Sequence, residues 1–585
     1  MCSEMGIFPW LPLLLYFICL TTIFLVGYIP HEDHIKCSSG NANCTISNVY
    51  RSFPDRSICR AAEAAYPTTE EGLLSIVANA TFLQKKMRIA TSLSNSIPKL
   101  MCPDGENGLI ISTKYLNRRV GLDESAMTIT VETGMTLRQL INESAMAGLA
   151  LPYAPYWWGV TIGGILGTGA HGSTLWDLGP AVHDYVIELR IVTPAGPDEG
   201  YAKVRTLKIG DPELDAARVS LGVLGVISQV TLQLQPLFKR SITFLEKDDS
   251  DLGAQISTFG NQHEFADFTW FPSQKKVLYR IDDRVPYNTT GNGVFDFFGL
   301  SPVSSFLTAV SRTIEEIQEY TGHAVGKCIT GSLGRYILKK AGYGLTNDGT
   351  SFKGYPVVGY HNNLQSSGTC LDTPKDGLWT ACAWDQRFKG LYFFQNGISI
   401  SLYKAKDFIQ DVQKLVALQP KALCGVDIYN GILIRYITAS SAYLGKQEDS
   451  VEFDITYYRS KDPMAPRLHE DIFEEIEQMA VFKYGGMPHW GKNRHLTFIG
   501  AINKYENAGE FLKVKQSYDP LGLFSTKWTD KVLGLRDGIT VLKEGCALEG
   551  LCICSQDIHC APKKRYFCRP GKVYKNARVC TQLTS

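Results

Sequence analysis

The chain has 585 residues, which is too long for one ordinary hydrophobic core, so two or three domains are expected. A net charge of +1 with 20% charged residues excludes a strong overall attraction for nucleic acid or acidic partners. A hydrophobic fraction of 44% and an aromatic fraction of 11% exclude a disordered chain.

An uncharged segment lies near the start of the sequence, at residues 7–30. Pro9 and Pro12 interrupt its beginning and leave residues 13–27 as an apolar core of signal-peptide length. We interpret residues 1–29 as a cleaved signal peptide, with an uncleaved membrane anchor as the alternative. Both interpretations predict the secretory pathway, and hence a secreted, cell-wall or vacuolar protein.

Cysteines and glycosylation sequons point to the same compartment. An even number of cysteines follows Cys2 and Cys19, and disulfides are their expected state under oxidising conditions. These cysteines are residues 37, 44, 59, 102, 328, 370, 382, 424, 546, 552, 554, 560, 568 and 580. N-x-S/T sequons predict a glycoprotein modified at Asn43, Asn79, Asn142 and Asn288.

Helical and strand-like patterns alternate from Tyr66 to about Pro236. The T-T-E-E sequence at Thr68 resembles a capping box and predicts a helix to about Lys86. Residues 127–132 (MTITVE) alternate apolar and polar side chains, which predicts a strand. The other predicted elements are strands at 87–91, 109–111, 185–193 and 223–234, and helices at 136–146 and 211–220. This order predicts a domain of sheets and helices.

The patterns change between residues 240 and 480, where a second domain is expected. No element is predicted between 285 and 370, because Gly, Ser and Asn are frequent there and no clear period emerges. The predicted elements are strands at 242–245, 391–394, 398–402 and 451–458, and helices at 407–418 and 466–479.

A glycine run occupies residues 159–177, which read GVTIGGILGTGAHGSTLWD. Dense glycines permit positive φ and close approach of a ligand, and exposed backbone N–H groups can bind a pyrophosphate. A P-loop is excluded because no Lys-Ser/Thr pair follows, and the Rossmann G-x-G-x-x-G order is absent. The glycines alone leave a turn without a ligand as an equal alternative to a dinucleotide site.

This run resembles the flavin-binding signature of the vanillyl-alcohol-oxidase family, and within it the aldonolactone oxidoreductases. Residues 220–232 (SLGVLGVISQVTL) resemble the adenine-side strand of that family, and residues 487–493 (MPHWGKN) contain its His-Trp-Gly-Lys tetrad. The plant gulonolactone-oxidase-like members are the most similar, because they share a cysteine-rich tail.

The resemblance implies an α+β fold. It consists of a two-part FAD-binding domain of the PCMH type, at 50–237 and 481–540, around an inserted antiparallel-sheet cap at 240–480. A cysteine-rich tail follows at 541–585.

The resemblance also implies a set of residues around FAD. Residues 89–100 match the first pyrophosphate loop, and many relatives carry a His there that is bonded covalently to the flavin. Asn95 stands in its place and cannot form that bond, so FAD is expected to be non-covalent. Ala170 is expected close to the isoalloxazine. The expected cofactor-binding residues are Ser92, Ser94, Asn95, Ser96, Gly163, Gly164, Gly167, Gly169, Ala170, His171, Gly172, Ile227 and Trp490.

The catalytic residues implied are Lys492, His489 and Arg435. Lys492 would place a cation beside the flavin, where negative charge develops on reduction. A cap strand of the family binds substrate hydroxyls through a Glu-x-Arg pair. Arg435 matches the Arg, but Leu433 stands where Glu is expected, which weakens the prediction of the usual lactone. No metal is expected, because no His or Cys lies at metal-binding spacing around His171.

The tail from Cys546 to Cys580 contains six cysteines, whose pairing the sequence leaves open. Zinc is the alternative, but the Cys552-x-Cys554 spacing does not suit it. Residues 561–585 carry seven Lys or Arg and no Asp or Glu. A solvated basic face is one interpretation of this charge, and a site for acidic polysaccharide is the other.

The expected activity is FAD-dependent oxidation of an aldonolactone, first L-gulono-1,4-lactone with O2, which gives L-ascorbate and H2O2. One alternative is another carbohydrate or alcohol oxidase on the same fold. The other is a catalytically weak, wall-associated binding protein that keeps the flavin fold as a scaffold.

Overall fold

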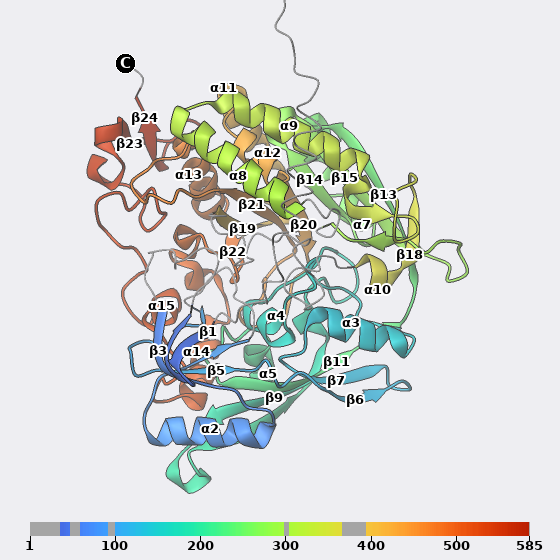
Figure 1. Ribbon diagram of the computed structural model, residues 1–585, viewed down its shortest axis with the longest axis vertical. Helices are drawn as coiled ribbons and strands as arrows, with labels where there is room; N and C mark the ends of the chain where they lie inside the picture. The colour runs from blue at the N-terminus through green and yellow to red at the C-terminus, as the bar shows by residue number, and fades with distance from the viewer. Residues whose placement is uncertain (1–34, 47–58, 92–99, 298–303, 366–392, 584–585) are drawn as a thin grey trace, which may run out of the picture.

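The computed structural model describes residues 35–46, 59–91, 100–297, 304–365 and 393–583. The predicted signal peptide at 1–29 therefore lies outside the described residues. Two parts lie one above the other in Figure 1, with the N-terminal sheets in the lower part and a larger sheet with its helices in the upper part.

A five-stranded mixed sheet of order β1-β2-β3-β5-β4 forms one side of the lower part. β3 and β4 pair with β5 in parallel, whereas β1, β2 and β3 pair antiparallel. Helix α2 (Glu70–Phe82) begins at Thr69, whose hydroxyl accepts the N–H of Gly72, so the predicted helix is confirmed. The strands are Ile35–Ser39 (β1), Ala42–Ile46 (β2), Cys59–Ala65 (β3), Met87–Ala90 (β4) and Leu109–Ser112 (β5).

A second, antiparallel sheet of order β10-β9-β11-β7-β6 completes the lower part. Helix α3 (Leu137–Met146) opens with a capping box between Thr136 and Gln139 and buries Leu137, Leu140 and Ile141 against this core. The strands are Arg119–Asp123 (β6), Thr128–Glu132 (β7), Val186–Pro194 (β9), Ala202–Lys208 (β10) and Val226–Gln233 (β11). Short helices α4 (Ile162–Thr168) and α5 (Pro212–Ala217) complete it.

The upper part is built on an eight-stranded sheet of order β18-β13-β15-β14-β20-β21-β19-β22, whose neighbours are all antiparallel. This arrangement agrees with the expected cap. Its strands are Lys239–Asp248 (β13), Asp267–Phe271 (β14), Lys276–Val285 (β15), Val357–Tyr360 (β18), Phe393–Ser401 (β19), Ile432–Ile437 (β20), Ser450–Tyr458 (β21) and Met487–Pro488 (β22).

Helices cover the cap sheet (Figure 1). The helices α11 (Leu402–Leu418) and α13 (Glu470–Gln478) confirm the two predicted from sequence. The helices α8 (Ser304–Thr321) and α9 (Ala324–Lys340) were not predicted, because the glycines of α9 obscure the helical period. One of the α9 glycines, Gly331, allows close packing, since a Cβ there would lie 2.9 Å from the side chain of Asp427 on α12 (Cys424–Ile428). The disulfide Cys328–Cys424 joins the same two helices.

Two strands predicted at 391–394 and 398–402 are one continuous strand, β19. Gly397 interrupts the sequence pattern but not the strand. A Cβ at Gly397 would lie 3.0 Å from the carboxyl carbon of Glu452 and 3.1 Å from Cβ of His489, so the glycine allows three segments to pack closely.

The chain returns to the lower part through α14 (Ala508–Tyr518) and α15 (Lys527–Val532). The buried guanidinium of Arg88 on β4 ties this return to the N-terminal segments. It donates hydrogen bonds to the carbonyl oxygens of Leu100 (2.7 Å), Leu221 (2.8 Å), Gly222 (2.9 Å) and Phe524 (2.6 Å). Because these partners are neutral, burial dominates and lowers the pKa of Arg88 to about 10.

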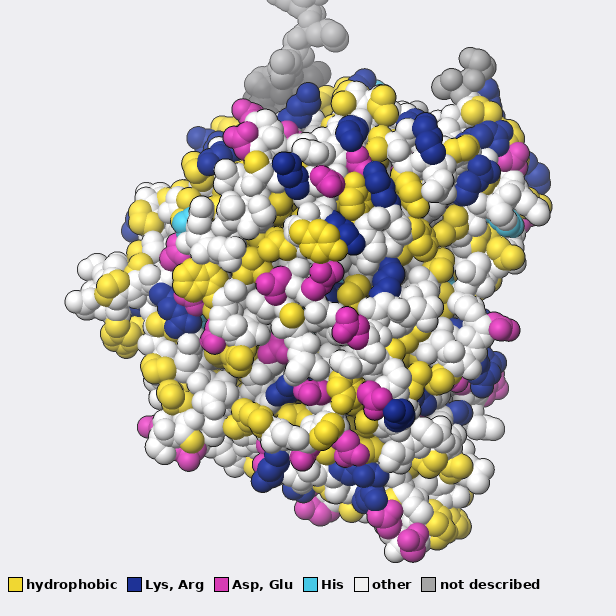
Figure 2. All heavy atoms as spheres, turned by 180° about the vertical axis from the view of Figure 1, so that it is seen from behind, with side chains coloured by type: hydrophobic (Ala, Val, Ile, Leu, Met, Phe, Trp, Pro, Cys, Tyr) yellow, Lys and Arg dark blue, Asp and Glu magenta, His cyan; other side chains and the backbone are white. Residues whose placement is uncertain are grey.

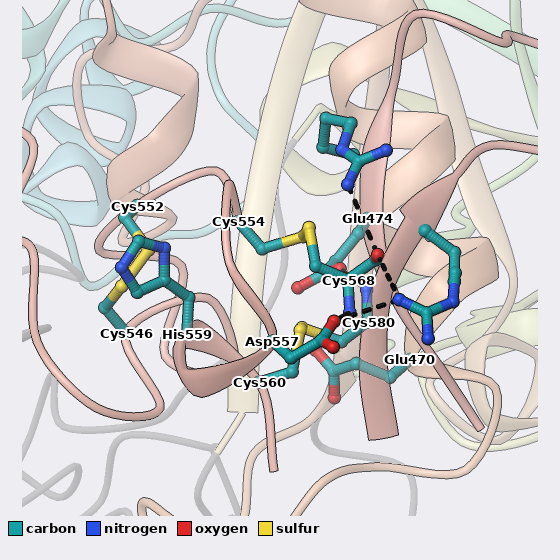
Figure 3. Close-up of a disulfide and its surroundings, with 12 residues drawn as sticks. Glu470, Glu474, Cys546, Cys552, Cys554, Asp557, His559, Cys560, Cys568 and Cys580 are labelled. Carbon is teal, nitrogen blue, oxygen red and sulfur yellow. Dashed lines mark hydrogen bonds and ion pairs between the residues drawn. A yellow bond between two sulfur atoms is a disulfide. The ribbon is translucent and has the colours of Figure 1, made fainter. Parts of the chain in front are cut away.

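The C-terminal segment is a small module cross-linked by disulfides (Figure 3). Its pairs are Cys546–Cys552, Cys554–Cys568 and Cys560–Cys580, which confirms the predicted disulfides. Its strands are Tyr566–Pro570 (β23) and Arg578–Gln582 (β24). Disulfides also join Cys37–Cys44 and Cys59–Cys102 in the N-terminal segment, whereas Cys370 and Cys382 lie outside the described residues.

The module packs on α13, every residue of which is buried. Glu475 accepts the backbone N–H groups of Val573 and Tyr574 at 2.6 Å each, and Glu474 accepts that of Cys580 at 2.7 Å. Figure 3 shows Glu474 beside the disulfides. The tail is therefore fixed to the cap by hydrogen bonds from its backbone to buried glutamate side chains of α13.

The face opposite to the view of Figure 1 carries interspersed basic and acidic side chains (Figure 2). Within the described ranges, no helix combines the length and apolar character needed to cross a bilayer.

Candidate active site

A cavity of about 380 Å³ lies where the two parts of the protein meet. The glycine run, β4 and residues near 220–227 form its lower wall, and β19, β20, β21 and the segment from His489 to Lys492 form its upper wall. The lining residues that the sequence singled out are Gly163, Gly164, Gly167, Ala170, His171, Ile227, Arg435, His489 and Lys492.

The lower wall suits a dinucleotide. Gly167 lines the cavity, and a Cβ there would meet no atom within 4 Å, so any side chain would occupy cavity space. Gly225 has a φ of +143°, and a Cβ there would lie 2.4 Å from the carbonyl oxygen of Val192. Backbone and short hydroxyl residues thus line this wall, which suits a pyrophosphate group. The hydroxyl residues are Thr91, Thr113, Thr133, Thr161, Thr168 and Ser220.

Three predicted cofactor residues, Gly169, Gly172 and Trp490, are not among the residues that line this cavity. Gly169 ends α4 with a φ of +64°. A Cβ at Gly172 would lie 2.6 Å from the carbonyl oxygen of Ala154. The indole of Trp490 is 3% exposed and donates its N–H to the carbonyl oxygen of Leu444 at 3.0 Å. Neighbouring protein atoms fill the space beside Gly172 and Trp490, so these residues support the glycine run from outside the cavity.

Arg435 of β20 joins the cap to the glycine run. Its partner in the strand register is Glu452 of β21, and its Nη2 lies 2.5 Å from Glu452 Oε1. Its Nη1 donates to the carbonyl oxygen of His171 at 2.8 Å, while His171 Nε2 lies 3.1 Å from Glu452 Oε2. Burial raises the pKa of Glu452, but His171 and Arg435 together hold it well below its ordinary value. The carboxylate is therefore ionised and fixes Arg435.

Lys492 also contacts a carboxylate of β21. Its Nζ lies 2.7 Å from Asp454 Oδ2, and Gln395 Nε2 donates to Asp454 Oδ1 at 3.1 Å. Arg435 Nη2 lies 3.6 Å from the same Oδ2. Two cations and a carboxylate therefore meet at the upper wall of the cavity.

His489 is held as a neutral imidazole. Its backbone N–H donates to the carbonyl oxygen of Gly397 at 2.7 Å, and its Nδ1 accepts the N–H of Gly491 at 3.0 Å. Burial lowers the pKa of His489 well below its ordinary value. With Nδ1 as an acceptor, the proton resides on Nε2.

The folded chain also brings together groups that could hold a cation. Ligand atoms of His171, Glu452 and His489 lie within 4.8 Å of one another. This grouping could not be seen in the sequence, because the three residues come from three distant segments. In this structure Glu452 contacts His171 and Arg435, and His489 Nδ1 accepts the N–H of Gly491.

Sequence reasoning missed Glu452 and Asp454. Their spacing in V-E-F-D-I-T-Y-Y places them on one face of a strand, since side chains alternate. Two carboxylates on one face of a predicted strand could therefore have indicated site residues. The register that sets Asp454 opposite Leu433 and Glu452 opposite Arg435 could not be read, because the two strands are separated by an irregular loop.

Family comparisons cover most of the chain. The family described as "FAD binding domain" matches residues 61–197, and "D-arabinono-1,4-lactone oxidase" matches residues 230–532. A third, "L-gulonolactone oxidase 2-like, C-terminal domain", matches residues 543–582.

Similar proteins carry related names. An Arabidopsis thaliana protein named "Probable L-gulonolactone oxidase 1" is 58% identical over 98% of this chain and 97% of its own length. "L-gulonolactone oxidase 2" from the same plant is 58% identical over 97% and 96%. A Mycobacterium tuberculosis protein, "L-gulono-1,4-lactone dehydrogenase", is 25% identical over 84% of this chain and 100% of its own length.

Solved structures share the fold at lower identity. A solvent-stable cholesterol oxidase superimposes with a TM-score of 0.64 at 15% identity, over 85% of this chain and 98% of its own. The grass pollen allergen Phl p 4 gives a TM-score of 0.54 at 13% identity, over 80% and 90%.

Proposed function

Since this chain belongs to the L-gulonolactone oxidase family of FAD-dependent oxidoreductases, we propose that it oxidises L-gulono-1,4-lactone with O2, giving L-ascorbate and H2O2. The observation that carries this proposal is that the glycine run and the cations Arg435 and Lys492 line the same cavity. A binding wall for the cofactor and charged groups for a polyhydroxylated substrate thus face the same space.

The chain's own residues bind and orient the substrate. Bound FAD supplies the two-electron acceptor. Arg435 and Lys492 place charged N–H donors at the cavity wall, where they would stabilise the negative charge that hydride transfer from the substrate leaves on the flavin. Glu452 and Asp454 hold these cations in place through the contacts of 2.5 and 2.7 Å. Preorganised charges of this kind do not have to reorient during the reaction.

The charge balance of the upper wall favours a neutral substrate. The carboxylates of Glu452 and Asp454 offset the two cations, Arg435 and Lys492. An anionic sugar acid would find no net positive field there, whereas a neutral lactone needs none and binds through hydroxyl hydrogen bonds.

The proposal is tested by anaerobic mixing of the purified flavoprotein with a panel of lactones and sugars. L-Gulono-1,4-lactone should bleach the flavin absorbance faster than the others. Bleaching by a different sugar or alcohol would favour another oxidase on this fold. A protein that carries flavin but is bleached by none would favour the binding-protein alternative.

We further propose that FAD is bound without a covalent link. The support is Asn95 in the sequence, which has no nucleophilic nitrogen to bond the flavin; the residues Ser92, Ser94, Asn95 and Ser96 lie outside the described part of the chain. Acid precipitation should leave the yellow colour in the supernatant. Flavin that remains on the denatured chain would contradict the proposal.

Residence in the secretory pathway is likewise a proposal. It is supported by the uncharged segment at 7–30 and by the six described disulfides. Binding of acidic polysaccharide gains no such support, because several basic groups of the tail have internal partners. Lys572 contacts Asp471, Arg569 contacts Asp557 and Lys564 contacts Asp462.

A further inference from the structure

Asp454 has a place in the cavity that no other described carboxylate shares. Among the described residues that line the cavity, it is the only Asp or Glu. Glu452 is 0% exposed, and both of its oxygens are occupied by Arg435 and His171. The side chain of Asp454 is 9% exposed and faces the cavity beside Lys492 and Gln395.

Asp454 also retains capacity to accept hydrogen bonds. An ionised carboxylate offers about four acceptor positions. Lys492 donates to one oxygen at 2.7 Å and Gln395 to the other at 3.1 Å, while Arg435 stands off at 3.6 Å. Acceptor positions therefore remain on a carboxylate that the structure directs into the cavity.

The neighbours of Asp454 leave space for a ligand. In the strand register it lies between Leu433 of β20 and Gly397 of β19. Leu433 lines the cavity as an apolar surface, and Gly397 has no side chain. This wall thus combines the apolar side chain of Leu433 with one hydrogen-bond acceptor, Asp454, and two donors, Lys492 and Gln395. Such a surface matches a sugar ring, which has an apolar C–H face and a polar edge of hydroxyl groups.

We propose that Asp454 is a substrate-binding residue that accepts a hydrogen bond from a hydroxyl group of the lactone. Asp454 of β21 places a carboxylate beside Leu433 of β20, the position where a Glu was expected. Asp454 also positions Lys492, so that acceptor and cation contact the same hydroxyl-bearing edge of the ligand. This inference rests on the proposed lactone oxidation and identifies what selects the hydroxylated substrate.

The test measures binding without turnover. L-Gulono-1,4-lactone is titrated calorimetrically into the fully reduced holoenzyme under anaerobic conditions, where the flavin cannot be reduced further. Asp454→Asn should raise the dissociation constant about 10-fold or more, since hydrogen bonds to charged groups are the stronger class. Glu448→Gln, whose carboxylate accepts from Ser401 outside the cavity, is the matched control and should bind as wild type.

A second pair of variants separates direct contact from support of Lys492. In a Lys492→Met background, Asp454→Asn should still weaken binding about 5-fold or more, because the hydroxyl acceptor is lost independently. Absence of any effect in that background would overturn the direct contact. The double variant Leu433→Glu/Asp454→Ala should bind more tightly than Asp454→Ala, because a carboxylate is returned from the opposite strand.

The outcomes distinguish this inference from the proposed function. If wild type binds and is reduced by the lactone but Asp454→Asn binds equally well, the inference is wrong and the function stands. If wild type neither binds nor is reduced by any lactone, the proposed function fails first. Should Asp454→Asn not fold with FAD, Asp454→Ser provides the same comparison, and equal loss of FAD and lactone binding in both would assign a purely structural role.

Discussion

Replacing Gly550 by alanine tests whether the C-terminal module supports the active-site segment. Gly550 has a φ of +66°, and a Cβ there would lie 2.1 Å from Nη1 and 2.5 Å from Cζ of Arg494. Arg494 follows Lys492 by two residues, and its side chain is 0% exposed. Its Nε donates to both oxygens of Glu477, at 3.0 and 2.9 Å, so a shift of the guanidinium away from the new Cβ would disturb these bonds.

The expected loss of stability has two parts. A left-handed backbone conformation costs a residue with a Cβ about 1–2 kcal/mol. Overpacking a rigid site adds about 1–3 kcal/mol. Gly500→Ala isolates the first part, because Gly500 has a φ of +67° and its Cβ would meet nothing within 4 Å. Gly550→Ala should therefore be destabilised by about 1–3 kcal/mol more than Gly500→Ala.

The assay is thermal unfolding of the holoenzyme, followed by tryptophan and flavin fluorescence, with lactone-driven flavin reduction measured at 25 °C. Gly550→Ala should unfold at a lower temperature than Gly500→Ala and should reduce its flavin more slowly, since a displaced Arg494 shifts the segment that carries Lys492. Equal unfolding temperatures for the two variants would refute the proposed contact between the module and Arg494.

Three other variants or measurements address the site and the tail. Lys492→Met should slow flavin reduction about 100-fold or more while leaving FAD content unchanged, because one preorganised charge is lost; an unchanged rate in rapid-mixing experiments would place the site elsewhere. Arg435→Ala should act on the lactone KM more than on FAD retention, and it should also lower stability because Glu452 stays buried without its partner. Non-reducing peptide mapping should recover Cys546–Cys552, Cys554–Cys568 and Cys560–Cys580; free thiols or bound zinc at these positions would contradict the pairing.

Local patterns predicted the local structure well. Thr136, followed three residues later by Gln139, marks a helix start that depends only on neighbouring residues. The 17-residue helix α9 was missed because its glycines serve tertiary packing, as Gly331 does against Asp427. A helix start that depends on neighbouring residues can be predicted from one sequence. The role of a glycine that packs against a residue far away in the sequence cannot.

The residues of the candidate site likewise fall into those that the sequence predicted and those that only the fold brings together. The resemblance led to Lys492 and Arg435, which do line the cavity. It also led to Trp490, which instead packs in the core with its N–H on Leu444. Asp454 lies beside Leu433 only through strand register, and registers between strands joined by long connections are set by the whole sheet.

The cysteine-rich module is synthesised after the active-site segment that it supports. The backbone N–H of Cys580 donates to Glu474, and Gly550 packs against Arg494, so the support behind Lys492 is complete only after Cys580 has left the ribosome. The Cys560–Cys580 disulfide cannot form before that moment either, because Cys580 is synthesised 20 residues after Cys560. A nascent chain that has emerged only as far as the active-site segment therefore lacks the module that packs behind it.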